Sequence, residues 1–210
     1  IDTILENAFG NPLFIREYVN YAREAKDVSS LPTTIQNIFL SSISSHDTEM
    51  QELLKKLSVF RQNFSRADAA YIHEKTEGNP GMVESAISFY LREGVLTEEN
   101  GLCFFRHDVF KKALYNSLLN YNKRILHRLI ARRMQEVGRP NIPRLLYHFS
   151  RALDLEGLKE IILSKQYLSS INPEYLPYID ILLGSIWDEE KMTLLKLLFL
   201  KSAIHFNNGN

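Results

Sequence analysis

The chain has 210 residues, of which 45% are hydrophobic, and its 25 basic and 25 acidic side chains cancel. This size and apolar content allow a buried core and exclude a disordered polypeptide. The balanced charge gives no overall field that would attract nucleic acid or an anionic membrane. A single cysteine, Cys103, excludes an internal disulfide, and no apolar run is long enough to span a bilayer, so we expect a cytoplasmic protein.

Residues 1–45 are expected to form a small helical subdomain. Gly10 is followed by Asn11 and Pro12, which fit the N-cap and the first position of a helix, and apolar residues recur after them with helical spacing. Ile1 stands inside a helix-like pattern. We therefore expect this chain to be part of a longer polypeptide.

Residues 46–120 predict helices at 47–60, 66–76 and 81–92, followed by a β-hairpin that turns at 98–101. Three helices and a two-stranded wing are typical of a winged-helix domain. Its core is expected to contain Leu53, Leu54, Leu57, Phe60, Ala70, Ile72, Ile87, Leu91, Leu96 and Phe104.

His107 follows the second strand of the predicted wing and begins the next helix. Backbone N–H groups at a helix N-terminus have no partner within the helix, and the helix dipole adds positive potential there. Such a position favours an anion such as a phosphate. The alternative is a partly buried structural histidine bonded to a backbone carbonyl.

Residues 121–210 are expected to be helical throughout, with no strand pattern. Short connections between successive helices indicate antiparallel helix pairs, which resemble tetratricopeptide repeats and are expected to begin a longer array. The fold class predicted for the whole chain is mainly α. It comprises a helical lid at 1–45, a winged helix at 46–120 and repeat-like helices at 121–210.

Several short motifs occur in an order that resembles a known family. They are Gly10-Asn11-Pro12-Leu13-Phe14-Ile15-Arg16-Glu17, Leu31-Pro32-x-x-Ile35-Gln36, Phe104-Phe105-Arg106-His107-Asp108, Ala113-Leu114-Tyr115 and Leu126-His127. In this order they are similar to the STAND class of P-loop ATPases, in particular to large bacterial transcription regulators and to kinase- or cyclase-linked sensors. The resemblance covers about residues 8–155.

The resemblance implies a role for three residues. Gly10 and Pro12 would belong to the lid, with the proline near the adenine of ATP or ADP, and His107 would contact the β-phosphate of ADP in the closed state. The helical repeats would bind a protein or small-molecule effector. Because the phosphate-binding motif G-x-x-x-x-G-K-[ST] is absent here, the resemblance implies a P-loop domain elsewhere in the same polypeptide.

For this chain alone we expect no bound nucleotide, no catalytic residues and no metal site. Cys103 is interpreted as a small packing residue in a strand, and the histidines other than His107 lack the spacing of metal ligands. The element Gly78-Asn79-Pro80 is interpreted as a turn. The basic residues Arg124, Arg128 and Arg132 lie at helical spacing and are interpreted as a solvated face.

Two other functions remain open. The first is a stand-alone interaction module with an apolar groove near Tyr167, Tyr175, Tyr178 and Trp187. The second is DNA binding by the winged helix. It is disfavoured because the third helix carries one basic residue, Arg92, against Glu84, and the wing tip carries two glutamates.

Overall fold

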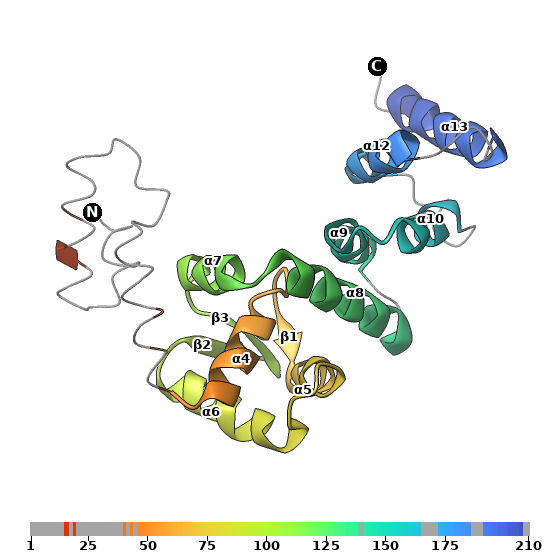
Figure 1. Ribbon diagram of the computed structural model, residues 1–210. Helices are drawn as coiled ribbons and strands as arrows, with labels where there is room; N and C mark the ends of the chain where they lie inside the picture. Colours follow the sequence, from red (N-terminus) through yellow and green to blue (C-terminus); the bar gives the residue numbers. More distant parts are fainter. Residues whose placement is uncertain are drawn as a thin grey trace. The chain divides into compact units, whose positions relative to one another are not determined.

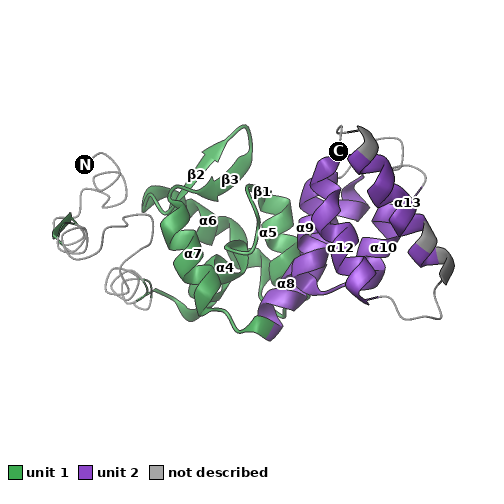
Figure 2. Ribbon diagram, turned by 90° about the horizontal axis from the view of Figure 1, so that it is seen from above, with its two compact units in different colours: residues 1–120 green, residues 121–210 purple. Residues whose placement is uncertain are grey.

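The computed structural model describes residues 46–138, 141–164, 172–185 and 191–207, together with the single residues 15, 16, 19, 40 and 43. The chain divides into two compact units, Ile1–Asn120 (unit 1) and Tyr121–Asn210 (unit 2), shown in green and purple in Figure 2. The described residues are mainly helical and include one small antiparallel sheet. The mainly α class predicted from the sequence is confirmed, whereas the predicted lid lies almost entirely outside the described residues.

Helices of unit 1 gather around its first described helix, α4, which packs against α5, α6 and α7 (Figure 1). In chain order the described elements of this unit are α4 (Thr48–Leu57), β1 (Phe64–Ser65), α5 (Arg66–Lys75), the 3₁₀ turn η1 (Pro80–Met82), α6 (Val83–Arg92), β2 (Leu96–Glu99), β3 (Leu102–Phe105) and α7 (Asp108–Ser117).

Polar side chains cap the helices where the sequence predicts their starts. The carboxylate of Asp47 accepts hydrogen bonds from the backbone N–H groups of Glu49 (2.9 Å) and Met50 (3.4 Å) at the start of α4. Ser65 and Asp68 form a capping box at α5, in which each side chain accepts a hydrogen bond from the backbone N–H of the other. The predicted start of this helix, at residue 66, is confirmed.

The predicted hairpin is also present. Its strands β2 and β3 pair so that Glu99 lies opposite Leu102, which leaves a two-residue turn at Asn100 and Gly101. Both turn residues have positive φ, 52° and 76°. Positive φ at both positions gives the tight connection whose twist matches that of the strands, and Asn-Gly is a favoured pair for it.

The sheet has a third strand, β1, that the sequence did not predict. β1 pairs with β3 on the side opposite β2, so the strand order is β1-β3-β2, with Phe64 opposite Cys103. Two residues are too few to show the alternation by which strands are recognised in a sequence.

The core of unit 1 includes one face of β3. Cys103 and Phe105 are buried, whereas Phe104 is partly exposed, because successive strand residues point to opposite faces. The prediction that Phe104 lies in the core is therefore wrong. In α5 the buried alanine is Ala69, while Ala70 is partly exposed, as is Leu91 in α6. The other predicted core residues are buried, namely Leu53, Leu54, Leu57, Phe60, Ile72, Ile87 and Leu96.

Unit 2 is helical in the part of it that the structure describes. Its elements are α8 (Asn120–Val137, whose first residue closes unit 1), α9 (Ile142–Ala152), α10 (Leu155–Leu163), η2 (Pro173–Tyr175), α12 (Leu176–Ser185) and α13 (Lys191–Asn207). Successive helices from α9 onward pack together around one apolar core, which α8 joins through Ala131.

A close approach between α9 and α10 shapes this unit. The helices are joined by Leu153, which has a φ of 55°, and Asp154, whose carboxylate caps α10 by accepting from the Gly157 N–H at 3.0 Å. A Cβ atom at Gly157 would lie 2.4 Å from carbon atoms of the Phe149 ring. The glycine therefore allows the ring to pack directly on the backbone of α10.

Candidate functional site

His107, the predicted phosphate contact, lies between β3 and α7. It is the N-cap residue of α7, and its carbonyl accepts from the N–H groups of Phe110 (3.2 Å) and Lys111 (3.4 Å). Its imidazole makes no side-chain capping bond and packs edge-on against Phe110, with ring centroids 6.3 Å apart. The ring is partly exposed, so it is not enclosed in the apolar interior.

The electrostatic environment keeps His107 neutral at pH 7. Partial burial lowers the pKa of its imidazole, and the positive field of the neighbouring Arg106 lowers it further. A neutral ring can still donate one hydrogen bond to an anion. The first-turn N–H groups of α7 add positive potential, whereas Asp108 in the same turn opposes it. The site can thus give a directed contact to an anion without adding a full positive charge.

Gly10 and Pro12, the other predicted site residues, lie outside the described residues, so their relation to His107 is not part of the structure. The second occurrence of this motif is described. Asn79 accepts from the Gly81 N–H at 2.9 Å, and Pro80 is the first residue of η1, between α5 and α6. The prediction that residues 78–80 form a turn is confirmed.

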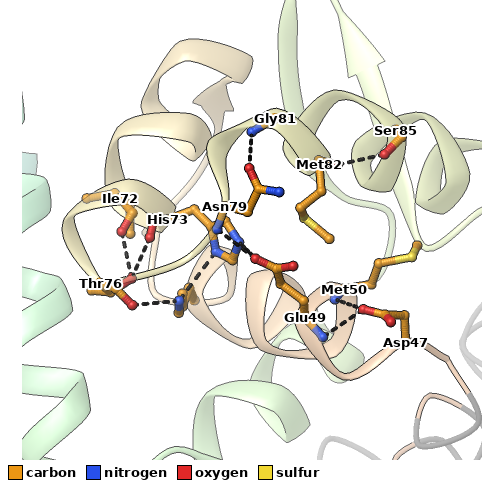
Figure 3. A network of polar contacts seen from close by, with 11 residues as sticks. Asp47, Glu49, Met50, Ile72, His73, Thr76, Asn79, Gly81, Met82 and Ser85 are labelled. Atoms are coloured by element: carbon orange, nitrogen blue, oxygen red, sulfur yellow. Dashed lines mark hydrogen bonds and ion pairs between the residues drawn. The ribbon is translucent and has the colours of Figure 1, made fainter.

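A buried histidine that the sequence did not single out lies beside this turn (Figure 3). The ring of His73 has no exposed surface; its Nε2 lies 3.4 Å from Glu49 Oε1 and its Nδ1 lies 3.3 Å from Lys56 Nζ. The same carboxylate oxygen accepts from the Asn79 N–H at 2.6 Å. Burial and the Lys56 charge lower the pKa of His73, and Glu49 opposes them.

This network joins α4 to the connection between α5 and α6. Lys56 also donates to the Thr76 carbonyl at 3.4 Å, and a Cβ atom at Gly78 would lie 2.4 Å from the His73 ring. Since its partners are 17 to 30 positions apart in the chain, no local pattern predicts it. The network holds these segments together, and the His73 ring at its centre has no access to solvent.

Helix α6 and strand β2, the predicted third helix and first wing strand, each carry a carboxylate that contacts Arg66 of α5. Arg66 of α5 donates to Glu84 of α6 and to Glu98 of β2, the latter at 2.7 Å. The hydrogen bond from Arg66 holds the pKa of Glu98 below its usual value, so this carboxylate is charged at neutral pH. Arg66, the basic residue of this cluster, is thus occupied by two carboxylates.

Other residues that the sequence analysis considered are buried, paired with Asp154 or packed on a core. Burial raises the pKa of the Cys103 thiol, so it remains protonated and a poor nucleophile. Arg128 and Arg132 contact the buried carboxylate of Asp154 at 3.1 and 3.7 Å. Tyr175 and Tyr178 pack against the core of unit 2, while Tyr167 and Trp187 lie outside the described residues.

The described residues include neither a candidate metal site nor a candidate membrane span. No group of three or more His, Cys, Asp or Glu side chains among them could hold a metal ion. No helix in the same part of the chain combines the length and apolar character needed to cross a membrane. Comparisons of the chain with protein-family models, with curated proteins and with solved structures found no match.

Proposed function

We propose that this chain is the regulatory part of a STAND-type signalling ATPase, in which it closes over ADP or ATP held by a P-loop domain of the same polypeptide. Binding of an effector to the helices of unit 2 would favour the open state. In this scheme the chain itself catalyses nothing. Together with the P-loop domain it would form a switch between a closed and an open state, and the nucleotide and the effector would each favour one of these states.

The observation that carries the proposal is the placement of His107. Its half-buried ring stands at the N-cap of α7, directly after the β2–β3 hairpin, and makes no side-chain capping bond to the helix. This is the position that the family resemblance assigns to the contact with the β-phosphate of ADP. A neutral imidazole beside a helix N-terminus can serve that contact.

The order of elements in unit 1 supports a winged-helix interpretation. Helix α4 is followed by strand β1, helices α5 and α6 and the β2–β3 hairpin, and β3 lies between β1 and β2 in the sheet. We propose that this winged helix packs against protein. The Arg66 cluster with Glu84 and Glu98 leaves the face of α6 and the wing poorly suited to a polyanion.

A second candidate function is a helical interaction module, and an observation on α13 favours it. Phe199 is 75% exposed and Leu198 is 45% exposed, beside the fully buried Leu197. Neighbouring exposed apolar side chains on one helix are typical of a surface that meets another protein. This candidate is compatible with the first, since the family's repeats bind effectors.

The proposal is tested by the nucleotide content of the intact polypeptide. His107→Ala is expected to lose ADP during gel filtration, while the wild type and the exposed-histidine control His205→Ala retain it. Circular dichroism would verify that both variants are folded. ADP retention in a folded His107→Ala variant equal to that of the wild type would contradict the assigned role.

A further inference from the structure

Two histidines in unit 2 face one another inside the protein. His127 of α8 and His148 of α9 are both fully buried, and their Nδ1 atoms are 2.9 Å apart, which is hydrogen-bonding distance. The rings are tilted by 47°, with centroids 5.0 Å apart, and the Tyr147 ring meets both edge-on. The two imidazoles therefore form one hydrogen-bonded contact between the helices.

The hydrogen bond between the two imidazoles is compatible with only a limited number of added protons. A hydrogen bond between two Nδ1 atoms needs one ring to carry the proton there and the other to present a lone pair. A first additional proton would place a charge in the core. A second would put N–H groups on both Nδ1 atoms, so that two donors would face each other and the contact would be lost.

The surroundings oppose even the first of these protons. Burial lowers the pKa of His127 to about 3, and the positive charge of Arg151 on α9 contributes. Asp154, the buried carboxylate at the start of α10, is engaged by two arginines of α8 and by its own capping bond. These contacts of Asp154 are made to groups other than the two imidazoles.

We propose that the His127–His148 pair is an acid-sensitive latch, which holds α8 against α9 at neutral pH and releases it in mild acid. In the released state the rings are solvated and take up protons near their ordinary pKa of about 6.5. Linkage then shifts the equilibrium toward the released state by up to about tenfold per pH unit below that value for each ring that charges. The response therefore begins well above the pKa of the buried ring.

Hydrogen exchange on the full chain, analysed by mass spectrometry between pH 7.5 and 5 and corrected for intrinsic exchange rates, measures this release. We expect the protection of α8 and α9 to fall by up to about a hundredfold between pH 6 and 5, which is about tenfold for each of the two rings. The His205→Asn variant, which alters an exposed histidine of α13, should behave like the wild type. In the double variant His127→Asn, His148→Asn the loss should be abolished, because an amide can occupy the Nδ1 position without titrating.

Equal pH dependence in the wild type and the double variant would overturn the proposal. Should the double variant fail to fold, NMR titration of the two imidazoles in the wild type decides the question. The latch requires both rings to stay neutral at pH 5.5 in molecules whose α8 and α9 amides remain protected. A charged ring in that protected state would refute it.

Discussion

Replacement of Gly157 by alanine tests the packing of unit 2 most sharply, because the change has two effects of opposite sign. Alanine is favoured over glycine inside a helix by about 1 kcal/mol. Against this, the added Cβ would lie 2.4 Å from Phe149 Cδ1 and Cε1 and 2.9 Å from Cζ, and no real Cβ contact is that short. The Phe149 ring is fully buried and cannot swing into solvent.

Forcing an extra methyl group into a packed core costs about 1–3 kcal/mol, and relief of a contact this short requires movement of a whole ring or of α10. We therefore expect a clash in the upper part of this range, about 2–3 kcal/mol, which outweighs helix propensity, so that Gly157→Ala lowers the free energy of unfolding by about 1–2 kcal/mol. Urea unfolding of the full chain, followed by circular dichroism at 222 nm, gives this difference.

The matched control is Gly184→Ala in α12. This glycine is exposed, and a Cβ atom there would meet nothing within 4 Å. Only the propensity effect remains, so this variant should be as stable as the wild type or more stable by up to about 1 kcal/mol. If Gly157→Ala were stabilised to the same degree as the control, the close packing of Phe149 on α10 would be refuted.

Three further predictions concern unit 1. Gly78→Ala should destabilise the chain by about 1–3 kcal/mol in urea unfolding, since its Cβ would meet the buried His73 ring at 2.4 Å; stability equal to the wild type would exclude that contact. Ser65→Ala should cost about 1 kcal/mol in the same assay by removing the capping box of α5, and a loss below a few tenths would mean that the cap contributes little. His73 is buried and its pKa is lowered, so the unfolded chain binds a proton at this residue more readily than the folded chain does. The contribution of His73 to the free energy of unfolding is therefore complete above pH 6.5 and falls below it by up to about 1.4 kcal/mol per pH unit. Thermal melts at pH 7.5 and 5.5 should show a smaller drop for His73→Asn than for the wild type, and an equal drop would contradict a neutral His73.

Local chemistry made much of unit 1 predictable from its sequence. Ser65 with Asp68 begins a helix, and Asn100-Gly101 closes a hairpin, because each signal acts through backbone groups within a few residues. The error at Phe104 came from choosing the face of a four-residue strand. Alternation along a strand does not say which of its two faces turns inward, and in the structure that face carries Cys103 and Phe105.

Contacts between segments far apart in the chain could not be predicted from local sequence signals. The neighbours of His73 come from α4 and from the turn after α5, and the partner of His127 is 21 positions away on another helix. A histidine within an apolar pattern gives no sign of the group that will face it. The sequence singled out His107 through the family resemblance and through its place after a hairpin and before a helix, and the structure reproduces that place.

The contact between His107 and a nucleotide phosphate is measured most directly by ³¹P NMR of ADP bound to the intact polypeptide. Comparison of the wild type with His107→Gln, and with His205→Gln as control, should show a shift of the β-phosphorus resonance in the first variant alone. The α-phosphorus resonance should move less. An unchanged β-phosphorus resonance in folded, ADP-bound His107→Gln would contradict the proposed nucleotide contact.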